Sequence, residues 1–434
     1  MKALVVAYYF PPVGGGGVNR TLKVVRGLAA AGWEPIVLTV TRAAWVQDPA
    51  LLSQVPRRAP VLRLPNPDWG RVAIRGAPRS APAAAGGRLR RWLIPDLHVA
   101  WSALTVPVAA AMAATRAVDL VYTSCPPYSA HAAGFAARVC GLPWVADFRD
   151  AWIECPTRLD FPPWRRRLEL GMEQAVLRRA DQVLFASEGA REAAVQRVAG
   201  LGARSETVLT GFDSADFPDS DAAPPAGRFE LVHAGSVVTN HLCETLDRLL
   251  DALRSWVARD PGVAADVSVC FVGAEPELAE RFDRAGLGSW VRVEPPAPRA
   301  LLGVRLRRAH ACLTLAAAAP YGSEPIPGKL FDAVGAGRPA LVLTPGGALA
   351  RIVRARGLGY AVDPRNTERV VELLAGLRER VLRGEAIPGP SEESRRALSN
   401  EHALARVLAV FERALVDSRR RRKQRWTHPS PSVS

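Results

Sequence analysis

The sequence predicts an α/β protein built from two doubly wound, Rossmann-like domains. The chain has 434 residues, is 48% hydrophobic and 23% charged, and alternates short apolar runs with helical patterns in both halves. Because a single core stops growing beyond about 250–300 residues, a chain of this size is expected to divide into two domains. Strands that alternate with amphipathic helices are typical of parallel sheets covered by helices on both faces.

The first half begins with a βαβ unit. Residues 2–10 are apolar and β-prone, residues 14–17 are four glycines, and apolar side chains then recur at helical spacing from Leu22 to Gly32. Residues 34–41 have the pattern of a second strand. Similar units follow, with strands expected at residues 120–124, 143–148, 182–186 and 207–210 and a helix at residues 131–140.

A polar, proline-rich stretch at residues 218–227 has the composition of a domain linker. We therefore expect a first domain at residues 1–217, a linker at 218–228 and a second domain at 229–385. The second domain repeats the alternation, with strands expected at residues 229–233, 267–272, 311–315, 340–343 and 359–362. A helical segment at 386–418 is expected to pack back on the first domain, and a basic, disordered tail at 419–434 completes the chain.

The net charge of +15 is concentrated in two runs that contain no acid. The basic residues of these runs are Arg71, Arg75, Arg79, Arg88, Arg90 and Arg91, and Arg419, Arg420, Arg421, Arg422, Lys423 and Arg425. Beyond Trp92 and Trp426 the runs lack interleaved aromatic residues, so binding of nucleic acid is not expected. The first run fits either a loop that touches the anionic inner face of a membrane or a solvated, arginine-rich loop.

The cysteines and histidines do not predict a metal site. The six cysteines form no CxxC pair and the seven histidines form no HxH or HxxxH pair, which indicates reduced cysteines and a cytoplasmic protein. The N-terminus lacks the features of a signal peptide. No run approaches the roughly 20 apolar residues that span a bilayer, so any membrane contact is expected to be peripheral.

Two acids flank a predicted helix start in the second domain. Lys329 opens the helix, Glu324 precedes it, and Asp332 lies one turn into it. The free N–H groups and the positive end of the helix dipole would form a site for a diphosphate. Asp332 would then reach ribose hydroxyls and Glu324 the hydroxyls of a transferred sugar. The alternative is a loop of solvated acids in which Asp332 is merely favourable in the first helical turn.

Several segments resemble the retaining glycosyltransferases of family 4. Residues 9–20 (YFPPVGGGGVNR) resemble the glycine-rich first loop of one branch, and residues 146–152 (ADFRDAW) its DFRD segment. Residues 211–213 and 233–236 resemble the turn that closes the first domain and the turn after the first strand of the second. Glu324 and Asp332 match the family's two acids separated by seven residues. The resemblance covers residues 1 to about 345 and implies the GT-B arrangement, two Rossmann-like domains facing a cleft.

The resemblance also implies roles for individual residues. The residues expected to be catalytic are Glu324, Lys329 and Asp150. The residues expected to bind the donor are Gly235, Ser236, His241, Gly328, Lys329, Leu330 and Asp332. The residues expected on the acceptor side of the cleft are Gly15, Gly16, Gly17, Arg20 and Arg149. For Arg149 and Asp150 a buried ion pair at a strand end is the alternative, and for the glycines a mobile turn.

The implied activity is transfer of a sugar, with retention, from a UDP- or GDP-type donor to a hydroxyl of a polysaccharide, glycolipid or secondary metabolite. No metal or other cofactor is implied. The sequence departs from the family where Pro325 and Pro327 lack N–H groups, and where Ser236 and His241 replace basic residues. A catalytically silent sugar-nucleotide-binding protein therefore stays open. A nicotinamide or flavin enzyme is disfavoured because Asn19 stands where its third glycine belongs.

Overall fold

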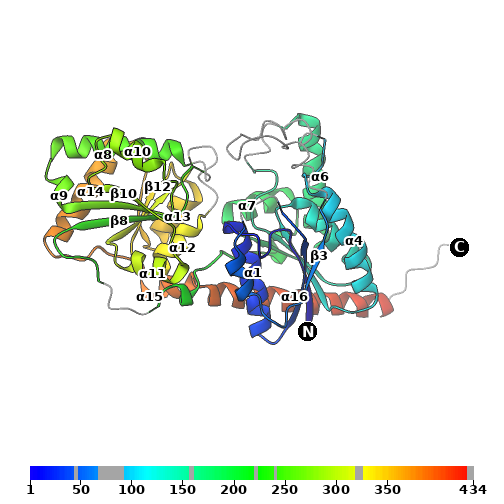
Figure 1. The fold of residues 1–434 in the computed structure, drawn as a ribbon. Coiled ribbons are helices and arrows are strands. Elements are labelled where there is room, and N and C mark those ends of the chain that lie inside the picture. The colour runs from blue at the N-terminus through cyan, green and yellow to red at the C-terminus, as the bar shows by residue number, and fades with distance from the viewer. Residues whose placement is uncertain are drawn as a thin grey trace. The chain divides into compact units, whose positions relative to one another are not determined.

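The structure, a computed structural model, describes residues 1–43, 47–66, 92–155, 161–218, 223–238, 242–317 and 326–427. The chain forms two compact units (Figure 1). Unit 1 comprises Met1–Leu209 and Leu404–Ser434, and unit 2 comprises Thr210–Ala403. Each unit contains one sheet of parallel strands, which confirms the predicted fold class of two Rossmann-like α/β domains.

The sheet of unit 1 has seven strands in the order β3-β2-β1-β4-β5-β6-β7. The strands are β1 (Lys2–Val6), β2 (Glu34–Val40), β3 (Val61–Leu64), β4 (Leu120–Cys125), β5 (Trp144–Phe148), β6 (Gln182–Phe185) and β7 (Ser205–Thr207). The order reverses between β1 and β4. In open α/β sheets this reversal is where ligands bind, beyond the carboxyl ends of the strands.

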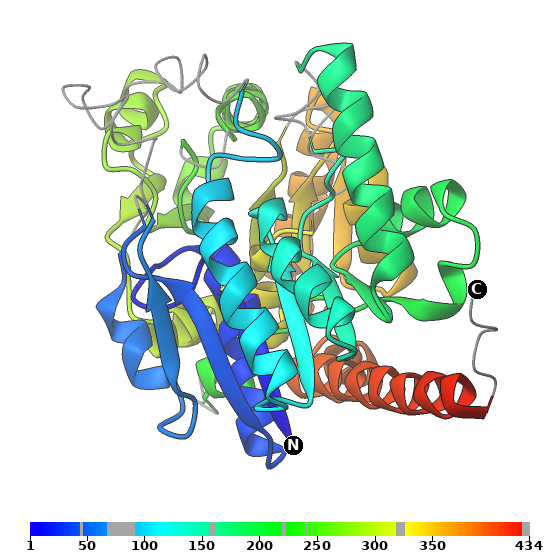
Figure 2. The same cartoon turned by 90° about the vertical axis from the view of Figure 1, so that its right-hand side faces the viewer.

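Helices cover both faces of this sheet (Figure 2). On one face α4 (Val99–Ala114) and α5 (His131–Val139) contribute alanines that pack with apolar side chains of β1 and β2. On the other face lie α1 (Gly16–Ala30) and α16 (Asn400–Thr427), where Gly27 lies directly against Leu404. The remaining long helices of unit 1 are α6 (Pro163–Arg179) and α7 (Glu188–Arg197).

The sheet of unit 2 has six strands in the order β10-β9-β8-β11-β12-β13. They are β8 (Phe229–Ala234), β9 (Val267–Val272), β10 (Val291–Glu294), β11 (Ala311–Leu315), β12 (Ala340–Leu343) and β13 (Gly359–Val362). The main helices are α8 (Cys243–Arg259), α10 (Leu278–Arg284), α11 (Arg299–Arg307), α12 (Gly328–Gly335), α13 (Gly347–Ala355), α14 (Thr367–Leu382) and α15 (Glu392–Ala397). Leucines of α8 and α14 form one apolar core with β8, β9 and β11, as the stripe of α8 predicts.

The chain passes from unit 1 to unit 2 after Leu209, eight residues before the boundary expected from composition. The reason is local pairing with the end of unit 2. The backbone N–H of Phe212 donates to Leu398 O at 3.2 Å, and the N–H of Asn400 donates to Phe212 O at 2.7 Å. Gly211 is required at this crossing, because a Cβ there would lie 2.3 Å from the backbone carbon of Ser399.

Helix α16 continues well beyond the predicted end of the helical segment. It runs to Thr427, where the sequence led us to expect a disordered tail from Arg419. Arginine, lysine and glutamine favour helix, so a run of these residues prolongs a helix that has already begun. The helix returns the chain to unit 1, where the ring of Phe411 lies 5.8 Å from Trp33 and 5.5 Å from Tyr122. Residues 428–434 lie outside the described part.

Candidate functional site

Three segments meet at the carboxyl edge of the sheet in unit 2. Strand β8 ends at Ala234 and continues into the turn at Gly235 and Ser236, β9 is followed by a loop that carries Glu275, and α12 begins at Gly328. Parallel strands place their carboxyl ends at one edge, which brings these segments together. Glu324 and His241, both predicted for this site, lie outside the described residues.

Lys329 and His233 form the centre of this group. The Nζ atom of Lys329 lies 3.0 Å from His233 Nε2 and donates to the carbonyl of Ser236 at 3.0 Å. The other ring nitrogen of His233, Nδ1, lies 3.1 Å from the carbonyl of Leu313. A carbonyl only accepts, so Nδ1 carries the hydrogen and Nε2 accepts from the ammonium.

Burial and the neighbouring charge of Lys329 lower the pKa of His233 well below its usual value, so this histidine is neutral. Burial also lowers the pKa of Lys329 to about 8, although Asp332 and Glu275 raise it. Lys329 is therefore a cation at neutral pH. Among the described residues its ammonium has two acceptors, and its third hydrogen is available to a ligand.

Glu275 fixes the turn that follows β8. Its carboxylate accepts a hydrogen bond from the hydroxyl of Ser236 and from the backbone N–H groups of Val237 and Val238, at 3.0 and 3.1 Å. Partial burial raises the pKa of Glu275, but these hydrogen bonds outweigh it and lower the pKa to about 2. Glu275 was not predicted from the sequence. The pattern that could have indicated it is an acid placed three residues after a buried strand.

Gly235 has the backbone conformation that the turn requires, and it lies beside Lys329. Its φ of 88° is in the region that favours glycine. A Cβ at this position would also lie 3.5 Å from Cε of Lys329. The structure therefore brings Gly235, Ser236 and Lys329 together, and the sequence predicts all three for the donor site. The contacts that the structure shows are between these residues themselves.

The start of α12 offers two backbone donors. Pro327 precedes the helix in extended conformation and no side chain caps it. The N–H of Leu330, predicted to help bind the donor, donates to Pro327 O at 3.1 Å. Its side chain is buried in the core. Within the part of unit 2 that is described, the N–H groups of Gly328 and Lys329 remain for a ligand.

Asp332 is anchored by an arginine that the sequence analysis did not single out. Its Oδ1 atom lies 2.8 Å from Nη2 of Arg299, and the same Nη2 lies 2.9 Å from Oδ2 of Asp216. The side chain of Asp332 is 15% exposed. The guanidinium fixes the direction of this carboxylate. Arg299 is the first residue of α11, eight residues after Val291 opens β10.

In unit 1 the glycine-rich loop meets the end of β5. Gly15 precedes α1 with a φ of 91°, and Gly16 is the first residue of the helix. The carbonyl of Gly17 accepts a hydrogen bond from Nη1 of Arg149. The guanidinium of Arg149 also lies 5.7 Å from the ring centre of Tyr9.

Asp150 lies beside this arginine, with Oδ2 at 3.7 Å from its Nε, and its side chain is 51% exposed. Half of this carboxylate is therefore in water, and the pair is not the buried ion pair that the sequence left open. The structure thus brings Gly17, Arg149 and Asp150 together at the carboxyl edge of the sheet in unit 1.

Arg20, predicted on the acceptor side of the cleft, lies instead in a buried ion pair with Asp147. The residue is 5% exposed, and its guanidinium binds both carboxylate oxygens of Asp147, with Nη2 to Oδ1 at 2.7 Å and Nε to Oδ2 at 2.8 Å. Its Nη1 donates to the carbonyl of Val208. Tyr122 and Ser124 donate to the same carboxylate. Arg20 ties α1 to the middle of the sheet, where the sequence showed only a basic residue after four glycines.

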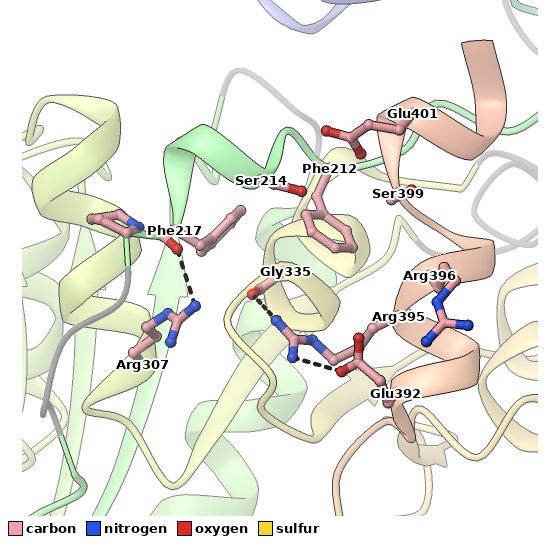
Figure 3. Close-up of a pocket in the computed structure, with 11 residues that line it drawn as sticks. Phe212, Ser214, Phe217, Arg307, Gly335, Glu392, Arg395, Arg396, Ser399 and Glu401 are labelled. Atoms are coloured by element: carbon pink, nitrogen blue, oxygen red, sulfur yellow. Dashed lines mark hydrogen bonds and ion pairs between the residues drawn. The ribbon is translucent and has the colours of Figure 1, made fainter. Parts of the chain in front are cut away.

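A cavity of about 550 Å³ lies in unit 2 at the other end of α12 (Figure 3). Arg395 donates there to the carbonyls of Val334 and Gly335, both at 3.2 Å, and so caps the C-terminus of the helix. The cavity is lined by Phe212, Ser214, Phe217, Pro218, Arg307, Gly335, Glu392, Arg395, Arg396, Ser399 and Glu401. None of these is a predicted site residue, so this cavity is separate from the group around Lys329.

Among the described residues no group of three or more histidine, cysteine or acidic side chains is placed to hold a metal ion. Within the same residues, no helix has both the length and the apolar character needed to cross a bilayer.

Comparison with known proteins gives the class of this fold. The family model described as "Glycosyl transferase 4-like domain" matches residues 15–209, which form most of unit 1. The chain is 28% identical over 271 residues to D-inositol 3-phosphate glycosyltransferase 1 of Catenulispora acidiphila, a match that covers 58% of this chain and 62% of that protein. The match thus spans less than two thirds of the curated relative.

Solved structures show the same two-domain architecture along nearly the whole chain. A glycosyltransferase of Rickettsia africae has a TM-score of 0.64 at 13% identity, covering 95% of this chain and 98% of its own. HepE of Anabaena, solved in complex with UDP-glucose, has a TM-score of 0.62 at 15% identity, covering 95% and 99%. The fold is therefore that of GT-B glycosyltransferases, with unit 1 similar to a glycosyl transferase 4-like domain.

Proposed function

We propose that this protein transfers a sugar from a nucleotide-activated donor to an acceptor hydroxyl, and that unit 2 binds the donor. One observation carries the proposal: the ammonium of Lys329 is held at the start of α12 by His233 and Ser236. The spacing of Asp332 from Glu324, the family match of unit 1 and the curated glycosyltransferase relative support the same function.

In this proposal the diphosphate of the donor binds at the start of α12. The N–H groups of Gly328 and Lys329, the helix dipole and the third hydrogen of the Lys329 ammonium all face the same anion. Asp332 binds the ribose hydroxyls through the oxygen that Arg299 does not hold. Glu324 contacts the sugar. A UDP- or GDP-sugar is the expected donor.

The reaction breaks the bond between the anomeric carbon and the diphosphate oxygen, and forms a bond from the anomeric carbon to the acceptor oxygen. The acceptor oxygen attacks the face of the anomeric carbon from which the diphosphate departs and gives its proton to that diphosphate, so the anomeric configuration is retained. Negative charge grows on the diphosphate as its bond breaks. Lys329 and the start of α12 are placed to stabilise that charge, which is how fixed dipoles and cations lower a barrier. No step requires a metal ion.

Unit 1 binds the acceptor in this proposal. Arg149 and Asp150 present hydrogen-bond donors and acceptors at the end of β5, beside Gly17. A lipid-linked acceptor is compatible with the basic run at residues 71–91, whose predicted contact with an anionic membrane lies outside the described residues.

The test is a two-stage screen of the purified protein. Thermal shift with UDP-, GDP-, ADP- and dTDP-sugars identifies the donor, and release of nucleoside diphosphate with candidate acceptors then measures transfer. Glu324→Ala should abolish transfer and keep nucleotide binding, whereas Lys329→Ala should weaken both. Normal turnover by Glu324→Ala would remove that residue from the mechanism. Binding without release for any donor and acceptor would favour the catalytically silent binding protein.

A further inference from the structure

Two tryptophans lie exposed and side by side on unit 1. The side chains of Trp92 and Trp164 are 71% and 45% exposed, and their ring centres are 6.4 Å apart. By contrast Trp101, Trp144 and Trp152 are at most 1% exposed. Removing large aromatic side chains from water lowers the free energy. An exposed pair of them therefore indicates a surface that a binding partner covers.

The pair is held in place by a buried arginine. Arg165 is fully buried, and its Nη2 donates to the carbonyls of Leu93 and Pro95, both at 3.1 Å. Its Nε donates to Oε1 of Glu169 at 2.7 Å, and Nε1 of Trp152 donates to the same carboxylate at 3.2 Å. These contacts fix the segment that follows Trp92 to the first turns of α6.

Exposed apolar and basic side chains continue from the pair along α6, the helix at the top of unit 1 in Figure 1. Leu168, 48% exposed, and the exposed Arg167 lie four and three residues after Trp164, which places all three on one side of the helix. Arg166 is exposed beside them. No acid occurs among residues 161–168, whose sequence is FPPWRRRL.

We propose that Trp92, Trp164, Arg167 and Leu168, flanked by Arg166, form a docking surface for an anionic lipid bilayer. Tryptophan favours the boundary between acyl chains and headgroups because its ring is apolar and its N–H is polar. Arginines beside it meet the lipid phosphates. A protein partner would have to match the same mixture with acids, whereas an anionic bilayer supplies both the apolar layer and the negative charge.

A membrane-docking surface is a property additional to the proposed function, because it determines where in the cell the protein acts. Its residues are all described in the structure, and Trp92 directly follows the basic run at residues 71–91. If unit 1 binds the acceptor, this surface would bring the enzyme to acceptors carried by membrane lipids. Binding to vesicles does not require turnover, so its failure and a failure of the glycosyltransferase proposal are distinguishable.

The test is sedimentation of the full-length protein with large unilamellar vesicles. Vesicles of phosphatidylcholine mixed with anionic phosphatidylglycerol are compared with vesicles of pure phosphatidylcholine. We expect binding to the anionic vesicles at low salt and weaker binding at high salt. Trp92→Ala/Trp164→Ala should lower the partition coefficient about tenfold, and Arg166→Gln/Arg167→Gln about fivefold for each arginine at low salt.

Matched controls use exposed residues of unit 2. Leu301→Ala removes a side chain that is 62% exposed, and Arg254→Gln/Arg356→Gln removes two exposed arginines. Both controls should bind vesicles as the unaltered protein does, and all variants should keep its melting temperature because only exposed side chains change.

Three results would overturn the proposal. The first is no binding to anionic vesicles at low salt. The second is unchanged binding by Trp92→Ala/Trp164→Ala, or a loss seen only when the basic residues 419–425 are neutralised. The third is an oligomer, detected by light scattering, that the tryptophan variant converts to a monomer without any effect on vesicle binding. That result would assign the surface to a second copy of the chain.

Discussion

Lys329 donates a hydrogen bond to His233, with 3.0 Å between Nζ and Nε2. The histidine lies on β8 in the core of unit 2, so the sheet itself sets the direction of a cation at the start of α12. The chain contains only four lysines among 57 basic residues, and this is the one lysine between residues 210 and 403. A branched guanidinium is larger than an ammonium and donates in a fixed plane, which does not suit this contact.

Replacing His233 should weaken nucleotide binding without removing the cation. His233→Phe removes the acceptor of Lys329, and we expect the affinity for the nucleoside diphosphate to fall about tenfold, the size of one charge-assisted hydrogen bond. Isothermal titration calorimetry measures this. His310→Phe is the matched control, since His310 lies just before β11 begins and its Nδ1 accepts from the backbone N–H of Glu230 instead of from Lys329. An equal loss in both variants would contradict a specific role for His233.

The affinity should depend on pH through Lys329. Its pKa of about 8 means that the ammonium loses its proton as the pH rises through 8, so the affinity for a nucleoside diphosphate should fall above that pH. Lys329→Arg should bind more weakly and show no such decline between pH 7 and 9.5. Titrations over this range, with a buffer control for ligand ionisation, measure both curves. A decline of equal size in Lys329→Arg would assign the titration to another group.

The same shift affects folding stability, with a sign that follows from proton binding. The unfolded chain holds the Lys329 proton up to its ordinary pKa of 10.5, whereas the folded protein loses it near pH 8. Because the unfolded state binds more protons between these values, this residue makes the free energy of unfolding rise with pH over that window. Urea denaturation of the unaltered protein and of Lys329→Met, at pH 7.5 and 9.5, should show a more positive change with pH when the lysine is present. The buried thiols, whose raised pKa values act in the opposite direction, are the same in both proteins.

Asp332 should determine how strongly the protein prefers a ribonucleotide to its 2′-deoxy form. If its carboxylate accepts from the ribose, the unaltered protein should bind UDP, or the diphosphate that the screen identifies, about tenfold more tightly than the 2′-deoxy form. Asp332→Ala should reduce this preference to near unity, because it removes both side-chain acceptors. Arg299→Gln leaves the carboxylate in place but frees its direction, so a smaller loss is expected there. An unchanged preference in Asp332→Ala would show that the ribose binds elsewhere.

The features that the sequence predicted correctly depend on residues close together in the sequence. The strands β4, β5, β9 and β11 were predicted within one or two residues because a strand buried on both faces is a mostly apolar, β-prone run. The helix start was predicted at Lys329, and α12 begins one residue earlier, at Gly328. Both signals are local in sequence.

Partners distant in sequence were beyond this kind of reasoning. Arg20 and Asp147 are 127 residues apart, and nothing in either segment indicates that the two charges neutralise each other in the core. Glu275 and Arg299 escaped for the same reason, because each acts on a turn or helix from another part of unit 2. Charged residues of the site can be recognised from spacing, but the choice between a ligand and a buried partner requires the fold.

The buried pair of Arg20 and Asp147 should dominate the stability of unit 1. Asp147→Asn leaves a buried guanidinium without its counter-charge, and removing one member of such a pair costs about 3–5 kcal/mol. Urea denaturation measures the loss, and Arg20→Met should show a similar one. The double variant Arg20→Met/Asp147→Ala should lose less than the sum, because no charge remains unpaired. Additive losses would mean that the two residues stabilise the unit independently.

Gly17 should control Arg149 through shape alone. A Cβ at Gly17 would lie 2.5 Å from Nη1 of Arg149, so Gly17→Ala must displace the guanidinium, which can move because it is the end of a flexible side chain. We therefore expect little change in stability and a loss of transfer rate of about tenfold, as in Arg149→Ala. In the double variant the losses should not add, because both changes remove the same contact. Gly171→Ala, at a position of α6 with open space around it, is the control and should leave the rate unchanged. Full additivity of Gly17→Ala and Arg149→Ala would separate the two residues and exclude a role for Gly17 in positioning the arginine.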